Sequence, residues 1–393
     1  MKILIVTPSL GPVFGGPTKV VLDLAQALTE RTVSVDIVAT NANGSGNLEI
    51  PLCQWITTKP YRIQYFPRWN IKDYTISLSL TAWLFRHVAD YDLVHTHTIF
   101  AYPVLPAEWA CQRYKVATIR TPHGMLEPWS LAYKAAKKRL YYALLEKPLL
   151  QRAGALHALN SSEAKNIQNL RLQNPVAIVS NGIHRHEFEV LPDPAIFYQR
   201  FPATQGKQLI LFLARIDPKK GLDLLAPAFA KVQNQFPETH LVIAGSDDIG
   251  FLPTAQGYFA QAGCLNHVTF TGILTGQLKQ AALAAASAYV LPSYSEGFSM
   301  SVLEAMASGL PCVITTGCNF PEAATAQAAH VVDISADAIA HALIECFRHP
   351  EQAKAMGDRA RELVFTQYEW NHIAAQMVEV YTTAIKDAAV AKS

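Results

Sequence analysis

Cysteine is scarce in this sequence, and its positions suggest no structural role. The six cysteines are Cys53, Cys111, Cys264, Cys312, Cys318 and Cys346. None belongs to a C-x-x-C pair, and Cys312 and Cys318 lack the second pair or histidine cluster that a zinc site needs. Extracellular domains often rely on disulfides, whereas cytosolic chains keep their thiols reduced. We therefore expect a reduced, cytoplasmic protein without structural zinc.

Long hydrophobic runs and an excess of one charge are absent as well. The longest apolar tract, residues 281–291, is rich in alanine, is interrupted by Ser287 and is too short to span a bilayer. The first apolar run, residues 3–6, is too short for the core of a signal peptide. Lysine and arginine number 33 against 31 acidic residues, a net charge of +2. This balance gives no reason to expect a nucleic-acid partner.

What the chain does contain is a strand, a glycine-rich turn and a helix, twice over. The first set is a strand at 3–6, a turn at 11–16 and a helix from 17 to about 30, and the second is a strand at 209–214, a turn at 215–221 and a helix from about 222 to 235. Turns of this kind between a buried strand and a helix are typical of doubly wound α/β folds. The repetition predicts two domains of similar design.

Further short apolar runs alternate with helical segments in both halves. They lie at 35–39, 93–95, 116–119, 156–158 and 177–179, and then at 241–244, 268–270, 288–291, 313–315 and 330–332. Continuous apolar strands between helices predict parallel sheets covered on both faces. We expect two Rossmann-like, doubly wound α/β domains, 1–188 and 189–370. Ligands of such sheets bind at the carboxyl ends of the strands, so the site would be a cleft that both domains face.

The strongest motif is the segment SYSEGFSMSVLEAMASGLP, which begins at Ser293. Because it follows a predicted strand, Glu296 should lie in a loop, and a helix should begin near Ser299. The free N–H groups and positive dipole end of a helix suit a phosphate, and Gly297 lets the backbone approach a ligand. Glu304, about one turn into the helix, can accept two hydrogen bonds from a ribose diol. Two glutamates alone could be ordinary surface residues, but the whole string favours a binding site.

A second motif, Arg215 with Lys220, follows the strand at 209–214. A departing nucleoside diphosphate needs positive charge where its negative charge develops. Arginine can bind phosphate oxygens with two parallel hydrogen bonds, and lysine adds a point charge. A lysine near a helix start is unfavourable for the helix dipole, which weakens a purely structural explanation. Lys219 competes for the same role, and the spacing favours Lys220.

With these motifs the chain resembles the retaining glycosyltransferases of family 4, which have the GT-B fold. The matching pieces are Gly15-Gly16, His123-Gly124, Asn181-Gly182-Ile183, Arg215 with Lys220, and Glu296-x7-Glu304. The resemblance covers nearly the whole chain. The glutamate string with Arg215 and Lys220 is specific, whereas the paired glycines alone would be weak.

The resemblance implies roles for particular residues. Arg215, Lys220, Glu296 and His123 would be catalytic, with Arg215 and Lys220 stabilising the leaving diphosphate and His123 facing the donor sugar. Donor-binding residues would be Gly15, Gly16, Gly272, Ile273, Leu274, Lys279, Gly297, Phe298, Ser299, Met300, Ser301 and Glu304. The turn at 272–274 would hold the base. The C-terminal helix, at about 371–393, would cross back to the first domain.

The implied reaction transfers a hexose with retention and needs no metal or other cofactor. A UDP-sugar such as UDP-glucose is favoured as the donor, and because no base-reading side chain is evident, GDP-mannose stays open. The acceptor would be a saccharide or a lipid-linked saccharide in bacterial exopolysaccharide or lipopolysaccharide synthesis. Two alternatives on the same scaffold are a UDP-sugar 2-epimerase and an inactive sugar-nucleotide binding module.

The chain departs from the family pattern at two places. Ser299-Met300-Ser301 replaces small apolar residues, which could change the choice of sugar. Residues 319–323 lack the usual glycine-rich continuation, which leaves the loop contacts there open.

Two other polar clusters invite a metal interpretation. His95 and His97 form a His-Thr-His at a strand end, but no third ligand is spaced nearby. A structural role or a place in the cleft wall is favoured. Asp90 and Asp92 resemble an Asp-x-Asp metal motif, but they precede a strand, so they would lie at the wrong end of the sheet. We interpret them as a solvated turn.

Basic residues gather on one predicted helical stretch. Lys134, Lys137, Lys138 and Arg139 are interleaved there with leucines. A basic amphipathic helix can lie on an anionic membrane, which would suit a lipid-linked acceptor. An ordinary surface helix with a solvated basic face explains the pattern equally well, and both interpretations remain open.

Overall fold

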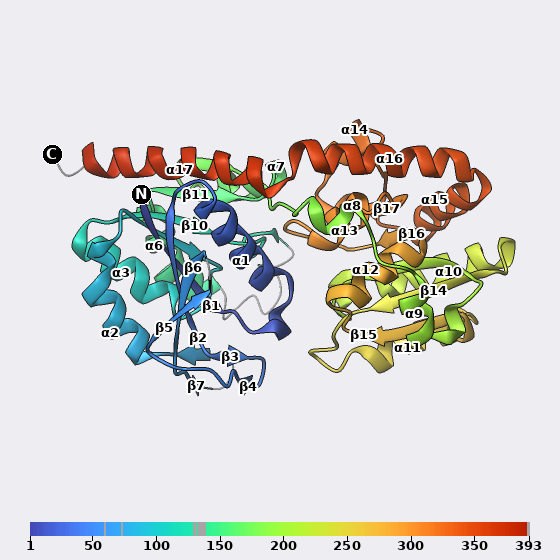
Figure 1. Ribbon diagram of the computed structural model, residues 1–393, viewed down its shortest axis with the longest axis horizontal. Helices are drawn as coiled ribbons and strands as arrows, with labels where there is room; N and C mark the ends of the chain where they lie inside the picture. Colours follow the sequence, from blue (N-terminus) through green and yellow to red (C-terminus); the bar gives the residue numbers. More distant parts are fainter. Residues whose placement is uncertain (59, 72–73, 129–130, 132–138, 391–393) are drawn as a thin grey trace. The chain divides into compact units, whose positions relative to one another are not determined.

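The computed structural model describes residues 1–58, 60–71, 74–128, 131 and 139–390. The chain forms two compact units (Figure 1). Unit 1 is Met1–Gly182 with Trp370–Ser393, and unit 2 is Ile183–Glu369. The division therefore falls after Gly182 and Glu369, where the sequence suggested 188 and 370. Ile183 lies in the core of unit 2, and its N–H donates to the carbonyl of Tyr368 at 2.8 Å.

Unit 1 is built on an eight-stranded sheet with the order β12-β11-β10-β9-β1-β2-β6-β5. The strands are β1 (Lys2–Ser9), β2 (Ser34–Thr40), β5 (Trp55–Thr58), β6 (Tyr61–Phe66), β9 (Leu93–His97), β10 (Ala117–Thr121), β11 (Ala155–Ala158) and β12 (Val176–Ile178). Neighbouring strands are parallel except that β5 is antiparallel to β6. Ile3, Leu4, Ile5 and Val6 are fully buried, as expected of a central strand covered on both faces.

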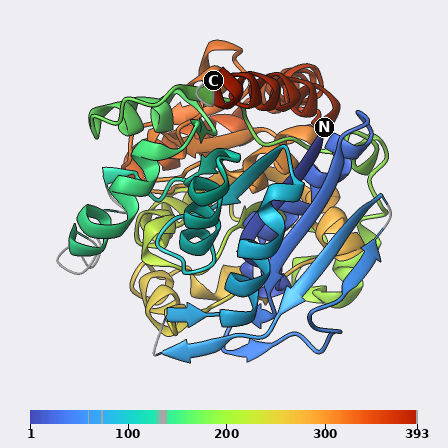
Figure 2. The ribbon, with the colours of Figure 1, turned by 90° about the vertical axis from the view of Figure 1, so that its left-hand side faces the viewer.

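Helices cover the sheet of unit 1. They include α1 (Gly16–Thr29), α2 (Leu78–His87), α3 (Val104–Tyr114), α6 (Lys147–Arg152), α7 (Ser161–Asn169) and α17 (Trp370–Val390). Helices α2 and α3 lie over one face (Figure 2), where Leu80 and Ala107 join Leu4 and Val6 in one core. Helix α17 packs against α1 and against β9 and β10. The end of the chain is therefore part of unit 1.

Segment 42–76 holds strands that the sequence did not predict. Besides β5 and β6, it forms two small antiparallel pairs: β3 (Ala42–Asn43) with β4 (Gly46–Asn47), and β7 (Trp69–Ile71) with β8 (Tyr74–Ile76). Polar residues interrupt the apolar pattern here; Arg62 in β6, for example, binds Asp36 of β2 through two hydrogen bonds. An apolar-run criterion misses such strands.

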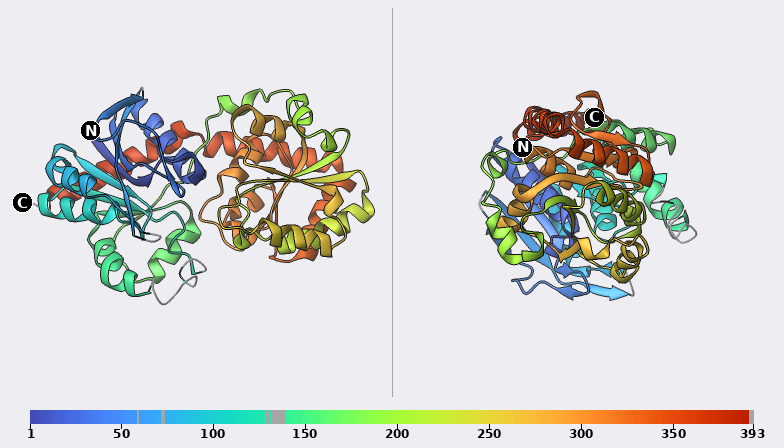
Figure 3. Two further views of the ribbon diagram at one scale, coloured as in Figure 1. Left: turned by 90° about the horizontal axis from the view of Figure 1, so that it is seen from below. Right: turned by 90° about the vertical axis from the view of Figure 1, so that its right-hand side faces the viewer.

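Unit 2 is built on a fully parallel six-stranded sheet with the order β15-β14-β13-β16-β17-β18. The strands are β13 (Gln208–Leu213), β14 (Thr239–Ala244), β15 (Val268–Gly272), β16 (Ala286–Leu291), β17 (Cys312–Thr315) and β18 (His330–Val332). The helices include α10 (Leu222–Gln235), α11 (Leu252–Gln261), α12 (Gly276–Ala285), α13 (Met300–Ala307), α15 (Ala336–Arg348) and α16 (Pro350–Gln367). They lie on both faces of the sheet (Figure 3).

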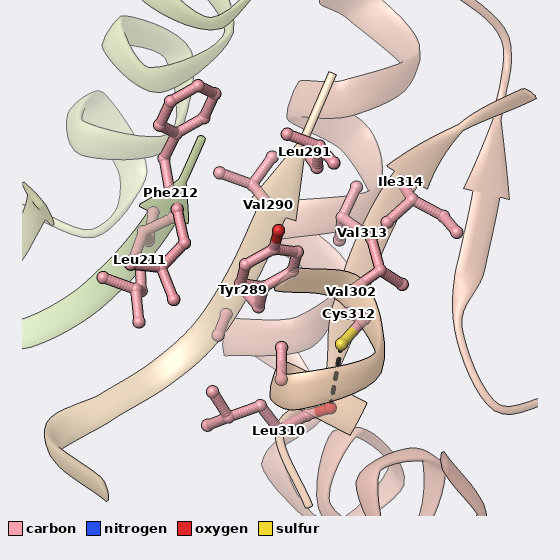
Figure 4. Close-up of a cluster of buried hydrophobic side chains, with 14 of the residues drawn as sticks. Leu211, Phe212, Tyr289, Val290, Leu291, Val302, Leu310, Cys312, Val313 and Ile314 are labelled. Atoms are coloured by element: carbon pink, nitrogen blue, oxygen red, sulfur yellow. Dashed lines mark hydrogen bonds between the residues drawn. The ribbon is translucent and has the colours of Figure 1, made fainter. Parts of the chain in front are cut away.

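The core of unit 2 explains the position of its central strands. Tyr289, Val290 and Leu291 of β16 are fully buried and pack beside Val302 of α13 and Val313 of β17 (Figure 4).

Within the described residues, no helix has the length and apolar composition needed to cross a membrane.

Candidate active site

The strand order of unit 2 places two predicted site residues at one point of the sheet. The chain runs β13, β14, β15 towards one edge and then returns to add β16 on the other side of β13. Ligands of doubly wound sheets bind beside the carboxyl ends of the strands at such a switch point. Lys220 follows β13 and Glu296 follows β16, and Lys220 Nζ lies 2.6 Å from Glu296 Oε1.

The turn that carries Lys220 is held from several sides. It is a 3-10 turn, Pro218–Lys220, and the Asp217 carboxylate accepts the N–H of Lys219 at 2.8 Å. Gly221 ends it with φ +71°, a conformation that favours glycine. A Cβ on Gly221 would lie 2.0 Å from the carbonyl oxygen of Pro292. This close approach brings the turn against the segment that leads to Glu296.

Glu296 is 7% exposed and is fixed by neighbouring loops. Its Oε1 also accepts the hydroxyl of Ser293 at 2.5 Å. Its backbone N–H donates to the carbonyl of Gly317 at 2.7 Å, and its carbonyl accepts from Asn319 Nδ2 at 2.6 Å. Burial raises the pKa of Glu296, but the ammonium of Lys220, helped by Ser293, outweighs burial and brings this pKa below the usual carboxyl value. The carboxyl group of Glu296 is therefore ionised at neutral pH.

A second lysine–carboxylate pair lies at the helix that follows. Glu304 of α13 is 5% exposed, and its Oε1 lies 2.6 Å from Nζ of Lys279 in α12. Helix α13 begins at Met300, with Ser299 as the residue before it, as the motif predicts. The segment 297–301 is partly exposed. The first N–H groups of a helix have no partner within the helix and favour an anion.

The two serines at the start of α13 are joined to the core. The hydroxyl of Tyr289 lies 2.8 Å from Ser301 Oγ, which lies 3.1 Å from Ser299 Oγ. Tyr289 is fully buried (Figure 4), and a buried hydroxyl needs a partner. Ser301 therefore has a structural task besides the donor contact that the resemblance implies.

The remaining predicted residues of unit 2 lie on the same edge of the sheet. Gly272 ends β15 with φ +72°, Ile273 is 55% exposed and Leu274 is buried. Arg215 is exposed just beyond β13, and it forms no ion pair within the part of the chain that the structure describes. The structure thus brings Lys220 to Glu296 and Lys279 to Glu304, and it leaves Arg215 at the rim.

Unit 1 has a switch point of its own, between β1 and β9. The turn after β1 contains Gly15, with φ +61°, and Gly16, the first residue of α1, and both are exposed. At the end of β9 lies His97, whose Nδ1 is 2.9 Å from Nε2 of His123 in the turn after β10. The predicted residues of unit 1 therefore also lie where a doubly wound sheet binds ligands.

The histidines of unit 1 form a larger cluster than the sequence suggested. His95 and His97 have His123 and His157 as neighbours, although these lie far along the chain. Within the described ranges, no group of three or more histidine, cysteine or acidic side chains is arranged to hold a metal ion. Asp92 accepts the backbone N–H of Lys2 at 2.7 Å, at the start of β1 and β9. This places Asp92 at the amino ends of these strands.

Some residues of the site carry no recognisable sequence signal. Asn319 and Gly317 hold the backbone of Glu296, and Asp223 accepts the hydroxyl proton of Tyr294 at 2.6 Å beside the Lys220 turn. Asn319 has φ +53°, which asparagine tolerates better than most residues. Of the predicted basic helix, Lys134, Lys137 and Lys138 lie outside the described residues, and Arg139 is exposed.

Solved structures similar to this chain identify the fold. Sucrose-phosphate synthase from Thermosynechococcus elongatus superposes with a TM-score of 0.79 at 21% identity, covering 98% of this chain and 100% of that one. The Anabaena protein HepE, in complex with UDP-glucose, gives a TM-score of 0.77 at 17% identity, covering 98% and 100%. The chain therefore has the GT-B fold.

Family models make the assignment narrower. Residues 14–187 match the model described as Glycosyltransferase Family 4, and residues 197–363 match Glycosyl transferases group 1. The chain belongs to the family 4 glycosyltransferases with the GT-B fold.

Curated relatives are similar at modest identity. An uncharacterized glycosyltransferase of Methanocaldococcus jannaschii is 27% identical over 219 residues, which is 54% of this chain and 55% of that protein. A D-inositol 3-phosphate glycosyltransferase of Streptomyces scabiei is 25% identical over 393 residues, covering 95% and 87%. A GDP-mannose-dependent alpha-(1-6)-phosphatidylinositol monomannoside mannosyltransferase of Mycobacterium tuberculosis is 30% identical over 200 residues, covering 48% and 51%. The first and third matches span about half of those relatives.

Proposed function

We propose that this chain transfers a hexose from a nucleotide-diphosphate sugar to a saccharide or lipid-linked saccharide, with retention and without a metal ion. The observation that carries the proposal is the Lys220–Glu296 pair at the switch point of unit 2, beside the start of α13. A buried carboxylate that holds a lysine at a ligand-binding edge keeps positive charge in place for a diphosphate.

Different residues of unit 2 bind different parts of the donor. The first N–H groups of α13 bind the diphosphate, and Lys220 and Arg215 stabilise its charge as the sugar bond breaks. Glu304, held by Lys279, accepts hydrogen bonds from the ribose, and the 272–274 turn lies against the base. Glu296 contacts the sugar with the part of its carboxylate that Lys220 and Ser293 leave available.

Retention follows if the acceptor hydroxyl attacks the anomeric carbon from the side of the leaving diphosphate. The bond to the diphosphate oxygen breaks, and that oxygen takes the proton of the acceptor hydroxyl. As the resemblance implies, we expect Gly15, Gly16 and His123 to contact the donor in this step. No side-chain nucleophile is required, in contrast to a covalent double displacement.

For the donor we favour UDP-glucose or a related UDP-sugar, with GDP-mannose as the second choice. The HepE structure is named as a complex with UDP-glucose, whereas the Mycobacterium tuberculosis relative is named for GDP-mannose. The turn from Gly272 to Gly276 contains no acidic side chain that could pair with the two N–H donors of guanine. A uracil base needs no such partner, and this favours UDP.

The test is release of free nucleotide from a panel of UDP- and GDP-sugars by the full chain, with and without saccharide acceptors. Glu296→Ala and Lys220→Ala serve as controls and should abolish the release. The proposal is supported if the sugar is transferred with release of free UDP or GDP and the new linkage has the same anomeric configuration as the donor. An epimerised donor, or nucleotide binding without turnover on any acceptor, contradicts it.

We also propose that unit 1 contacts an anionic membrane peripherally, where a lipid-linked acceptor in exopolysaccharide or lipopolysaccharide synthesis would be found. Leu140 and Leu144, one helical turn apart beside Arg139, are 63% and 66% exposed. Such leucines beside basic residues suit the lipid boundary. Liposome co-sedimentation of the wild type and a Lys134→Glu, Lys137→Glu, Lys138→Glu triple variant tests this. Equal binding of the two proteins would contradict it.

A further inference from the structure

His123 lies in a turn whose backbone is strained and specifically anchored. Its φ is +54°, and that of the next residue, Gly124, is +71°. A left-handed histidine is uncommon and persists where neighbours hold it. The buried carboxylate of Glu163 accepts the N–H of Gly124 at 2.6 Å and that of Leu159 at 2.8 Å. The backbone on which His123 stands is thus tied to the start of α7.

A chain of hydrogen bonds beside this turn has a defined direction. His157 Nε2 lies 2.7 Å from the carbonyl of Val179, which can only accept, so this nitrogen carries the proton. Burial lowers the pKa of His157 to about 4, so the ring is neutral and its Nδ1 must accept. The donor to Nδ1 is the hydroxyl of Thr121, at 2.7 Å.

The same reasoning continues to helix α17. Because the hydroxyl proton of Thr121 is used, its oxygen accepts from His95 Nε2, at 2.7 Å. Burial lowers the pKa of His95, which is therefore neutral, and its Nδ1 accepts the hydroxyl proton of Tyr381 at 2.7 Å. Every ring in this chain has one defined tautomer. These hydrogen bonds hold the rings of His157 and His95 in fixed orientations.

His97 and His123 form the last pair of the cluster. His97 is 1% exposed, and its Nε2 is buried with no hydrogen-bond partner among the described residues. A proton on that nitrogen would be a buried donor without an acceptor, which folded proteins avoid. The proton of His97 therefore sits on Nδ1 and is donated to Nε2 of His123 at 2.9 Å. The ring centroids are 5.1 Å apart, close to the largest separation that the 2.9 Å contact allows, so the bond lies near the plane of both rings.

The tautomer of His123 follows from this bond. Burial, with the neighbouring His157, lowers the pKa of His123 to about 3, so its ring is neutral. With Nε2 accepting, the proton must lie on Nδ1. His123 is partly exposed, and it can thus present an N–H donor with a fixed direction.

We propose that His97 is a positioning residue, which holds His123 as the Nδ1–H tautomer so that it donates to an oxygen of the bound sugar. This rests on the proposed function, in which His123 faces the donor. His97 itself, buried and turned towards His123, does not touch the substrate. In water, a neutral histidine also adopts the Nε2–H tautomer. The hydrogen bond from His97 to Nε2 of His123 excludes that tautomer.

The experiment compares wild type with His97→Asn and His97→Leu, which have side chains of similar size. The Asn amide can donate from about the place of Nδ1, whereas Leu cannot donate. The tautomer of His123 is read from ¹⁵N chemical shifts of histidine-labelled full chain, with the signal assigned by its loss in His123→Gln. Nucleotide release from UDP-glucose and GDP-mannose gives kcat and KM, and melting temperatures report folding.

We expect an Nδ1–H ring for His123 in wild type and His97→Asn, and a shift to Nε2–H in His97→Leu. We expect kcat to fall by about tenfold or more in His97→Leu, with a smaller change in KM and substantial recovery in His97→Asn. An Nε2–H ring in wild type, or equal rates in the two variants, would overturn the proposal. If wild type releases no nucleotide, the proposed function fails, and the wild-type tautomer alone decides the role of His97.

Discussion

Arg120 is one of the largest fully buried side chains and lies between two glutamates in unit 1. Its Nη2 is 2.7 Å from Glu146 Oε2, and its Nε is 3.6 Å from Glu108 Oε1. Burial raises the pKa of Glu108, and Arg120 opposes that rise. One guanidinium, on β10, thus compensates two buried carboxyl groups.

Replacing Arg120 with Met should destabilise the protein by about 3–5 kcal/mol, because both carboxylates lose their buried partner. The pKa of Glu108 should rise further above its unfolded value. When the pKa of a carboxyl is higher in the folded protein than in the unfolded chain, the folded protein loses stability as the pH rises from the unfolded-state pKa through the folded-state pKa. The loss in Arg120→Met should therefore be smaller near pH 4 than at pH 7. Denaturant unfolding at both values checks this, and a loss independent of pH would contradict it.

Gly221 offers a second test at the scale of one residue. Gly221→Ala should cost about 2 kcal/mol or more, because it adds a clash with the Pro292 carbonyl to the strain of φ +71°. Gly263→Ala is the matched control, since its φ is +74° and no atom lies within 4 Å of an added Cβ. Denaturant unfolding should show the larger loss for Gly221→Ala. Equal losses would mean that the close approach to Pro292 is unimportant.

Sequence reasoning at this scale reached residues with a local pattern. Glu296 and Glu304 stand in one recognisable string and Lys220 in a second motif, each after a predicted strand. The structure places their side chains in ion pairs at one edge of the sheet. Asn319 and Glu163 could not be found in this way. Their contacts join residues far apart in the chain, and nothing in the local sequence marks them.

At the scale of elements, helix α17 makes a buried polar contact with the sheet of unit 1. Tyr381 is fully buried, and its hydroxyl is the donor to His95 Nδ1. The nearby Arg31 also binds Asn371 at the start of the helix, at 2.7 Å. Helix α17 also packs against α1, β9 and β10. The helix is thus held in register as well as in place.

Tyr381→Phe should destabilise the protein by about 1–3 kcal/mol, since His95 Nδ1 would be a buried acceptor without a donor. The measurement is the free energy of unfolding in denaturant. Thr382→Val is the control, because that exposed hydroxyl bonds to Val378 within its own helix. A Tyr381→Phe loss no larger than that of the control would contradict the directed hydrogen-bond chain.

The elements themselves were predictable where burial is complete. Each strand expected from a continuous apolar run is present, because a strand covered on both faces has few places for polar side chains. Strand β6 was missed since Arg62 and Gln64 interrupt it. Gln64 is buried and Arg62 is paired with Asp36. A search for apolar runs does not detect a strand whose polar side chains have partners on other strands.

At the scale of the whole molecule, the two units follow one plan. Each is a doubly wound sheet, and in each the predicted site residues follow strands at or beside the switch point. In unit 1 these are the Gly15 turn and the His97–His123 pair, and in unit 2 they are Lys220 and Glu296. The sequence shows this shared design as a strand, a turn and a helix that occur twice. The chain's return through α17 into unit 1 was expected from family resemblance, which apolar periodicity could not have supplied.

The central claim is that Lys220 supplies the charge that lets the nucleoside diphosphate depart. The most direct measurement is kcat for nucleotide release from UDP-glucose and GDP-mannose by wild type, Lys220→Met and Lys219→Met. We expect Lys220→Met to lower kcat by about 100- to 1,000-fold on the donor that wild type uses. The neighbouring Lys219→Met should keep most of the rate. Wild-type kcat in Lys220→Met, or equal losses in both variants, would contradict the claim.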